Sequence, residues 1–122
     1  MLKYETLLND AFQDIPEFAN EYKKMVKMGY FDDETGKHIV FSWAFVPLLK
    51  DAILNNNTML SSRMLSFLEK MASSDDHLVQ EVCDFTVLEE LCDQVSPETV
   101  YPLLGKSTKE GFHAISRYMN YN

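Results

Sequence analysis

The stretch His38-Ile-Val-Phe-Ser-Trp-Ala-Phe-Val46 decides the fold class of this 122-residue chain, because its composition suits either a helix or a strand. Its β-branched and aromatic residues are typical of strands. However, no second segment shows a strand pattern with which it would pair, and Pro47 would be awkward inside a central strand. We therefore predict a buried helix that is bent or restarted at Pro47 and continues through Leu48, Leu49, Ala52 and Ile53.

The segments before this stretch also have helical spacing. Two apolar stripes recur at three and four residues, and Pro16 separates them, so we expect Pro16 to begin the second helix. A polar turn over residues 32–36 follows. The members of the two stripes are Leu7, Leu8, Ala11, Phe12 and Ile15, then Phe18, Tyr22, Met25 and Val26.

Four further helices are predicted after it. Apolar spacing indicates one over residues 58–72 and another that begins at the capping residues 73–76 and runs to about Asp93. Ser96 followed by Pro97 begins a short helix that ends at Gly105. Ser107-Thr-Lys-Glu110 has the form of a capping box that begins the last helix.

Together these elements predict an all-α fold in a single helical domain spanning residues 1–122. Hydrophobic residues make up 46% of the chain and there are only 4 Gly and 4 Pro, a composition typical of a packed core. Short connections favour antiparallel neighbours. We expect an array of about six to seven antiparallel helices, of which a HEAT-like stack is one form, although the sequence shows no internal repeat.

The charge is unevenly distributed along the chain. The net charge is −8, and residues 71–105 contain eight Asp and Glu residues but no Lys or Arg. Such a field disfavours direct binding to nucleic acid or to a membrane, because both need basic residues to neutralise phosphates. The N-terminus lacks the pattern of a secretory signal and the longest apolar run is too short to cross a bilayer, so we expect a cytoplasmic protein.

Two motifs resemble chemical sites but have simpler interpretations. Gly105-Lys-Ser-Thr108 looks like the end of a phosphate-binding loop, yet Val100 stands where such a loop needs its first glycine. Cys83 and Cys92 are nine residues apart, which on a helix turns them about 180° and separates them by roughly 13 Å. We expect both thiols to be buried and predict neither a metal nor a disulfide.

The histidines and the tryptophan have equally ordinary expectations. We expect His38 to hydrogen-bond within the core, and His113 to pair with Glu110 or face water. Trp43, with Phe41 and Phe45, is expected to belong to the core. No recognised catalytic signature is present, so we expect no enzymatic activity, catalytic residue or cofactor, although a Ser-His-Asp arrangement assembled from distant segments stays open.

The acidic segment 76–93 shows a reversal of its apolar face. In its first half Leu78, Val79, Val82 and Phe85 share one side, and from Val87 onward the apolar residues Val87, Leu88, Leu91 and Cys92 occupy the formerly polar side. A kink, or different neighbours along the two halves, would give this pattern. The acids could simply solvate the surface, but they have no local basic partners, and a cationic partner would relieve their repulsion.

Four strings resemble a family of small bacterial all-helical proteins, several of which look like immunity proteins of contact-dependent growth inhibition and related polymorphic toxin systems. The resemblance spans roughly residues 37–113, and its strings are His38-Ile-Val-Phe-Ser, Leu65-Ser-Phe-Leu-Glu69, residues 79–91 and Leu103-Leu-Gly105. It implies a protein that binds a cognate toxin domain, often a basic nuclease, and blocks it without chemistry of its own.

Our sequence-based hypothesis is therefore an immunity protein, a monomer that forms a heterodimeric complex with a basic toxin domain and covers its active or substrate-binding surface. The alternative is a helical adaptor or regulator that binds an endogenous basic protein. The candidate contact residues are Asp75, Asp76, Glu81, Asp84, Glu89, Glu90, Asp93 and Glu98.

Overall fold

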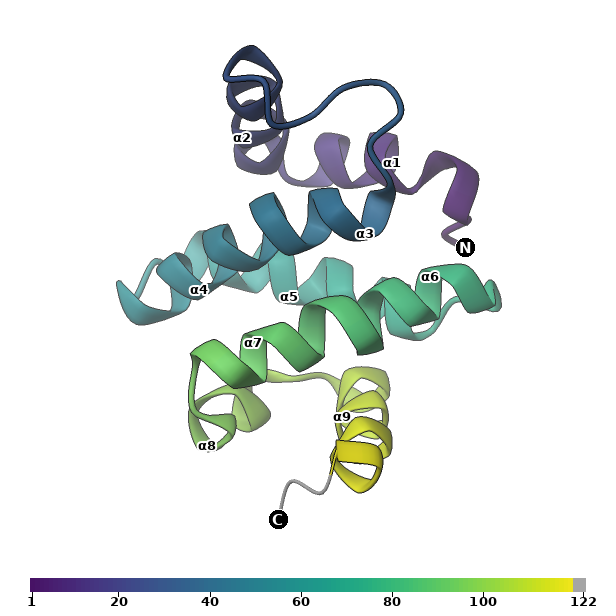
Figure 1. Ribbon diagram of the computed structural model, residues 1–122. Helices are drawn as coiled ribbons and strands as arrows, with labels where there is room; N and C mark the ends of the chain where they lie inside the picture. Colours follow the sequence, from purple (N-terminus) through teal and green to yellow (C-terminus); the bar gives the residue numbers. More distant parts are fainter. Residues whose placement is uncertain (120–122) are drawn as a thin grey trace.

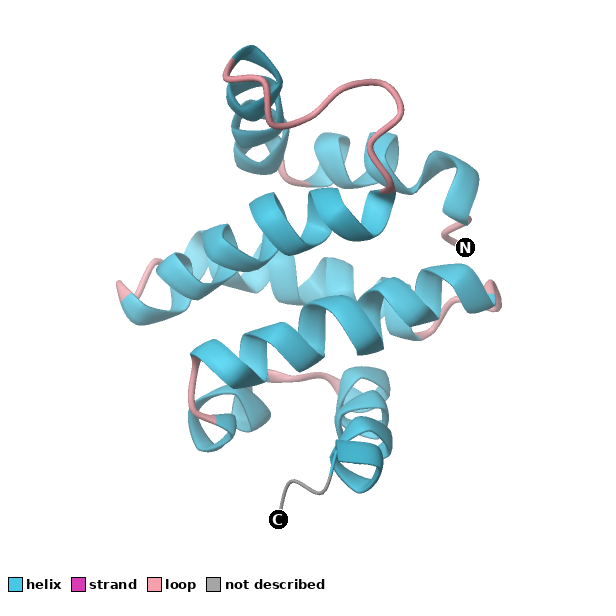
Figure 2. Ribbon diagram, in the orientation of Figure 1, coloured by secondary structure: helices cyan, strands magenta, loops and turns pink. Residues whose placement is uncertain are grey.

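The computed structural model describes residues 1–119, and within this part of the chain it contains seven continuous helical segments and no strand (Figures 1 and 2). The predicted all-α fold is confirmed. The first segment joins a 3-10 turn, Tyr4–Thr6, to α1 (Leu7–Asp14), and α2 (Pro16–Lys27) follows; near the C-terminus α8 (Pro97–Val100) continues into a 3-10 turn, Tyr101–Leu103, before α9 (Lys106–Met119).

The stretch that decided the fold class lies in one uninterrupted helix. This α3–α4 helix (residues 37–54) consists of α3 (Lys37–Val40), a π-helical turn (Phe41–Phe45) and α4 (Val46–Leu54). The prediction of a helix is confirmed, but the helix does not restart at Pro47. Proline has no N–H to donate, and its ring presses on the carbonyl four residues earlier. The wider π-helical turn lies just before Pro47, where it relieves this crowding.

The acidic segment forms a second helix with a π-helical turn. This α6–α7 helix (residues 77–94) consists of α6 (His77–Glu81), the turn Val82–Leu88 and α7 (Glu89–Gln94). The turn contains the predicted reversal at Phe85-Thr86, because extra residues per turn shift the buried stripe around the helix axis. The expectation that Leu78 and Phe85 share the buried side was wrong: they are 49% and 52% exposed.

Caps explain where the remaining helices begin. α5 (Thr58–Ala72) has the predicted bounds, and the side chain of Asn57 caps it by accepting a hydrogen bond from the Leu60 N–H at 3.3 Å. α2 begins at Pro16, as predicted. The capping box was a wrong prediction, because Ser107 lies inside the first turn of α9 and a carboxylate from another helix binds this N-terminus.

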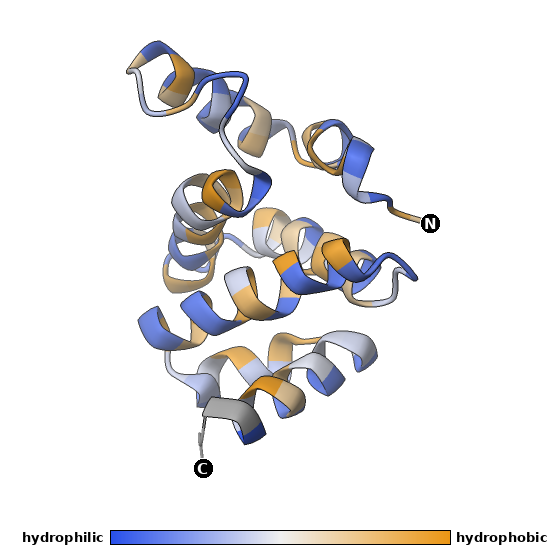
Figure 3. Cartoon of the chain, turned by 45° about the vertical axis from the view of Figure 1, so that its right-hand side comes forward, coloured by the Kyte–Doolittle hydropathy of each residue, from blue (hydrophilic) through white to orange (hydrophobic). Residues whose placement is uncertain are grey.

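Three helices, α3–α4, α5 and α6–α7, occupy the middle of the molecule, with α1 and α2 on one side and α8 and α9 on the other (Figure 1). Consecutive central helices run antiparallel (Figure 1). Hydrophobic and hydrophilic stretches alternate along the helices, as amphipathic helices require (Figure 3). Their apolar sides meet in a core whose largest fully buried side chains include Phe18, Phe41, Phe45 and Phe67.

Trp43 was predicted to belong to the core, and this prediction was wrong. Its neighbours Phe41 and Phe45 are fully buried, but half of the Trp43 side chain is exposed. The π-helical turn places it on the outer side of the α3–α4 helix. Within residues 1–119, none of the helices has both the length and the apolar composition required to span a membrane.

Candidate protein-binding surface

The two π-helical turns lie against each other on one side of the molecule. The turn Phe41–Phe45 packs on the turn Val82–Leu88, and two hydrogen bonds join the helices at this level. The Ser42 hydroxyl donates to Glu90 Oε1 at 2.6 Å, and His38 Nδ1 lies 2.7 Å from Thr86 Oγ1. These contacts fix the register of the two helices, which run side by side at the front of Figure 1.

Exposed apolar side chains flank this junction. Trp43 is 50% exposed and Ile39, one turn earlier on the same helix, is 42% exposed, while Phe85 lies on the α6–α7 helix. The Trp43 ring stacks on Phe31 with a centroid distance of 6.2 Å, and Phe31 stacks on Tyr22. An exposed aromatic residue held in place in this way is the usual anchor of a protein–protein interface.

Three predicted acidic residues lie beside these apolar groups. Glu81 and Glu89 are each four residues from Phe85, so they follow the same outer side of the α6–α7 helix, and Glu90 is bonded to the residue that precedes Trp43. Glu81 is exposed, whereas Glu89 and Glu90 are half-buried. Asp93 is exposed one turn beyond Glu89. We call one set of residues the acidic face: Ile39, Trp43, Glu81, Phe85, Glu89 and Glu90.

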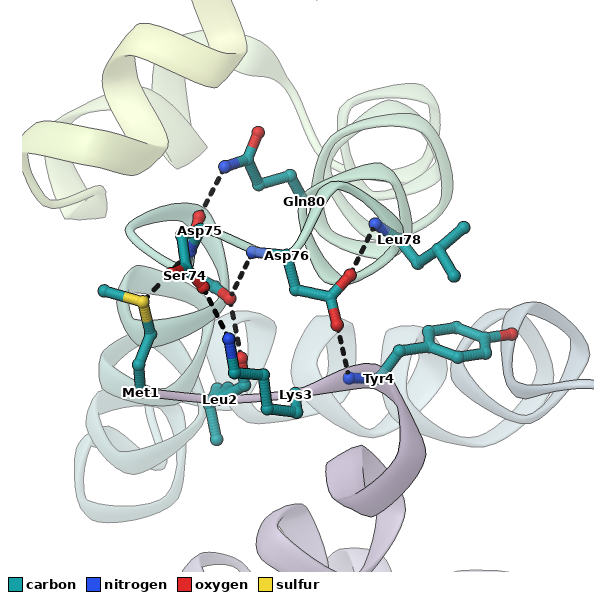
Figure 4. Close-up of polar contacts among 9 residues, drawn as sticks. All are labelled: Met1, Leu2, Lys3, Tyr4, Ser74, Asp75, Asp76, Leu78 and Gln80. Atoms are coloured by element: carbon teal, nitrogen blue, oxygen red, sulfur yellow. Dashed lines mark hydrogen bonds and ion pairs between the residues drawn. The ribbon is translucent and has the colours of Figure 1, made fainter.

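Asp75 and Asp76 have structural roles at the beginning of α6 (Figure 4). Lys3 Nζ pairs with Asp75 Oδ1 at 2.8 Å, and its hydrogen bond lowers the pKa of the Asp75 carboxyl. Asp76 accepts from the Tyr4 N–H at 2.8 Å and from the Leu78 N–H at 3.0 Å, and the first of these bonds is the main cause that lowers its pKa.

The same contacts tie the N-terminal segment to the acidic helix. Ser74 Oγ donates to the Leu2 carbonyl at 2.7 Å, next to the Lys3 pair, and Gln80 donates to the Ser74 carbonyl (Figure 4). Sequence reasoning missed Lys3 because it considered local ion pairs, whereas Lys3 comes from 72 residues away. Asp75, which is exposed, and Asp76, which is half-buried, are therefore bonded to the N-terminal segment rather than gathered with the acidic face.

Asp84 turns toward α9 instead of joining the acidic face. Gly111 approaches it so closely that a Cβ at position 111 would overlap the carboxylate. Asp84 Oδ1 is buried and has no hydrogen-bond partner in the described part of the chain. Burial raises the pKa of the Asp84 carboxyl, and the neighbouring Cys83 thiol only partly opposes this. Glu98, the last candidate, is exposed on α8.

Replacing Asp84 by asparagine should raise the free energy of unfolding at pH 7 by up to about 1 kcal/mol, a figure already reduced for the part of the carboxyl that water reaches. The pKa of Asp84 is higher in the folded state than in the unfolded state. Ionised Asp84 therefore lowers the free energy of unfolding at pH values above the folded-state pKa, and this loss disappears at pH values below the unfolded-state pKa. Urea unfolding at pH 7 and pH 3 measures both states. The variant should gain stability only at pH 7, and an equal gain at both values would contradict the assignment.

The motif Gly105-Lys-Ser-Thr108, which looked like the end of a phosphate-binding loop, binds a carboxylate of the same chain. Glu69 of α5 accepts from the backbone N–H groups of Ser107 and Thr108 at 2.8 and 2.9 Å and from the Thr108 hydroxyl at 3.0 Å. Burial alone would raise the pKa of Glu69, but the hydrogen bonds from the backbone and side chains of Ser107 and Thr108 together outweigh it and the pKa is lowered. The N-terminus of α9 therefore already holds an anion, and a side chain at Gly105 would collide with it.

The histidines and cysteines occupy ordinary positions. His38 bonds Thr86, as expected of a histidine that hydrogen-bonds internally. His113 is exposed, as one of its two expected placements had it, and its Nε2 lies 2.9 Å from the Tyr101 hydroxyl; the pairing with Glu110 is not seen. Both cysteines are buried, as predicted, and burial raises the pKa of the Cys92 thiol to about 11. Among residues 1–119, no three His, Cys, Asp or Glu side chains are placed to hold a metal ion.

Comparisons with known proteins add one finding. A family model described as a domain of unknown function (DUF7674) matches residues 8–120, which include all the central helices and α9. No curated protein and no solved structure matches the chain.

Proposed function

The chain belongs to the family described as a domain of unknown function, DUF7674, and we propose that it is a cytoplasmic immunity protein that binds a basic toxin domain with its acidic face. The bound chain covers the active or substrate-binding surface of the toxin, so inhibition requires no catalytic group, cofactor or metal in this protein. The functional unit is a complex of one chain with one toxin domain.

One observation carries this proposal: an exposed, positioned tryptophan stands next to carboxylates. Trp43 is half exposed and stacked on Phe31, and the residue before it, Ser42, bonds Glu90 on the neighbouring helix. Aromatic anchors supply much of the free energy of protein–protein interfaces. Because Trp43 is already held in place, little side-chain entropy remains to be lost on binding.

The carboxylates determine which partners fit. Glu81, Glu89 and Glu90 border the apolar residues, in a chain with a net charge of −8. A partner rich in Lys and Arg is attracted over a distance of about 8 Å at physiological salt, which accelerates encounter. After docking, these acids accept charge-assisted hydrogen bonds at the rim while apolar groups of the partner cover Trp43 and Ile39.

We expect two variants to weaken toxin binding by different routes. Trp43→Ala should lower affinity at least tenfold, about 1.4 kcal/mol, mainly through faster dissociation. Glu89→Lys combined with Glu90→Lys should slow association and reduce its dependence on salt. Titration calorimetry and stopped-flow binding at about 50 and 300 mM NaCl measure these effects. The partner in these measurements is the toxin domain that the proposal expects to be encoded directly upstream of this gene.

The matched control is Asp33→Lys with Glu34→Lys, which makes the same change in net charge at two exposed acids of the turn after α2. This control should bind with nearly unchanged affinity. The proposal is wrong if the acidic-face variants bind the toxin domain as the wild type does. If the wild type does not bind the toxin domain but binds a basic protein of its own cell through Trp43, the chain is an adaptor or regulator instead.

A further inference from the structure

We propose that the acidic face also binds a second copy of this chain, through the exposed basic end of α2, and that this contact keeps the face covered until the toxin displaces it. The inference rests on the proposed function for the cation-binding character of the acidic face. It adds a second binding surface, the basic end of α2, which in a second chain competes with the toxin for the acidic face.

The second surface lies at the C-terminal end of α2. Lys23, Lys24 and Lys27 are exposed there around three exposed apolar residues, Val26 (41%), Met28 (59%) and Tyr30 (55%). Side chains of Lys23, Lys24, Val26, Lys27 and Met28 line one open surface hollow. We call the lysine tip the three lysines together with Val26, Met28 and Tyr30.

The lysines of the tip differ from several other bases of the chain. Lys3, Arg63 and Lys70 form ion pairs with Asp75, Glu17 and Asp14. Among residues 1–119, none of the three tip lysines is in an ion pair, and neither are Glu81, Glu89 and Glu90 of the acidic face. In the described part of the chain, cations without an ion-pair partner therefore surround apolar groups at one place, and carboxylates without an ion-pair partner surround apolar groups at another.

The two surfaces are complementary in chemistry. The acidic face offers Trp43 and Ile39 beside its carboxylates, and the lysine tip offers Met28 and Val26 beside its ammonium groups. Contact would bury apolar surface on both sides and bring opposite charges together, the combination that gives both attraction and register. The tip thus has the same kind of chemistry that we propose for the toxin.

Within the described part of one chain the lysine tip does not meet the carboxylates of the acidic face, although Trp43 of that face is linked to Tyr22 of α2 through Phe31. α2 projects at one end of the molecule, whereas α6–α7 lies beyond the α3–α4 helix (Figure 1). The contact must join two chains, and it joins different surfaces on each. Such a heterologous contact leaves one tip and one face open at the ends, so chains can keep adding.

Salt should affect this association in both directions. Two chains of net charge −8 repel each other when screening is weak, as at about 10 mM salt, where the Debye length is about 30 Å. At about 150 mM the length falls to about 8 Å, so distant acids are screened while contacting charges still attract. At about 1 M the contacting pairs are screened as well. Association should therefore be strongest at intermediate salt.

Sedimentation equilibrium of the full chain tests the proposal, at protein concentrations up to about 1 mM and at the three salt concentrations above. The wild type should show an average mass that rises with concentration above that of one chain, 14.1 kDa, most strongly at intermediate salt. Lys24→Glu with Lys27→Glu, the tip variant, and Glu81→Lys with Glu89→Lys, the face variant, should each sediment as single chains.

An equimolar mixture of the tip and face variants gives the sharpest result. The tip variant keeps its acidic face and the face variant keeps its lysine tip, so one contact can form between them and the mixture should stop at two chains. Lys106→Glu with Arg117→Glu makes the same charge change as the tip variant at exposed α9 positions and should associate as the wild type does. Met28→Ser with Tyr30→Ser should weaken association without changing charge.

Three outcomes would overturn the proposal: wild-type chains that stay single at every salt concentration, variants that associate as the wild type does, or a mixture that forms no pairs. If the wild type stays single but binds vesicles of phosphatidylcholine and phosphatidylglycerol through the tip, the surface serves lipid instead. The tip variant also separates the two proposals, because it should bind the toxin normally while losing self-association.

Discussion

Replacing Phe18 with alanine is expected to lower the free energy of unfolding by about 4 kcal/mol, the largest single effect that we predict. Phe18 is fully buried in α2. Its ring contacts Phe45 edge-on at a centroid distance of 5.2 Å, Phe41 at 5.4 Å and Phe12 at 5.2 Å. Alanine would lose all three contacts and leave a cavity between α2 and the α3–α4 helix.

Urea unfolding followed by circular dichroism measures this loss. Phe18→Leu should cost much less, about 1 kcal/mol, because it keeps most of the volume. Phe85→Ala, in which the ring is already 52% exposed, should cost less than half as much as Phe18→Ala. A Phe18→Ala variant as stable as the wild type would show that α2 does not pack on the π-helical turn Phe41–Phe45.

Replacing Glu69 with alanine is expected to destabilise the protein by about 2 kcal/mol at pH 7, after allowance for the exposed part of the carboxyl. The variant loses three hydrogen bonds, from the Ser107 and Thr108 N–H groups and the Thr108 hydroxyl. It also removes the negative charge that faces the positive end of the α9 dipole. Hydrogen exchange should show that opening is greatest in α9.

The pH dependence of this effect has a definite sign. Because hydrogen bonds lower the folded-state pKa of Glu69, its contribution is fully present above the unfolded value of about 4.3. The contribution is lost as pH falls through the folded-state pKa. The difference between wild type and Glu69→Ala should therefore be constant from pH 6 to 8 and shrink below about pH 4.

Glu110→Ala is the matched control for Glu69→Ala. Glu110 is the acidic residue of the capping box predicted from sequence, and it is exposed on α9. The structure assigns the cap to Glu69, so Glu110→Ala should change stability by less than about 0.5 kcal/mol. If Glu110→Ala proved as costly as Glu69→Ala, the local capping box would be correct and the contact with α5 unimportant.

Local signals explain how much of the fold was predictable. Asn57 and Asp76 cap helices with their own side chains, and Pro16 begins α2, so these helix boundaries could be predicted from the sequence. Absence of a partner strand likewise decided that residues 38–46 form a helix. The face reversal at Phe85-Thr86 was also visible, although its cause, a π-helical turn, was not.

The candidate site was less predictable because its residues contact side chains that are remote in the sequence. The sequence indicated Glu81, Glu89 and Glu90, and the structure brings them to one face with Trp43, which had been assigned to the core. A hydrophobicity pattern cannot locate a wider turn, so it misplaced Trp43 and Phe85. Trp43 and the carboxylates lie on different helices, so their proximity is visible only in the packed α3–α4 and α6–α7 pair.

Periodicity, caps and composition act over a few residues, so they were sufficient to predict the all-α fold, most helix boundaries and the acidic character of residues 71–105. The roles of the individual acids depend on tertiary contacts. Lys3 pairs with Asp75, Asp84 faces α9 across Gly111, and Glu69 caps α9. These contacts join residues far apart in the chain, and their strength depends on distance in space, which no local pattern encodes.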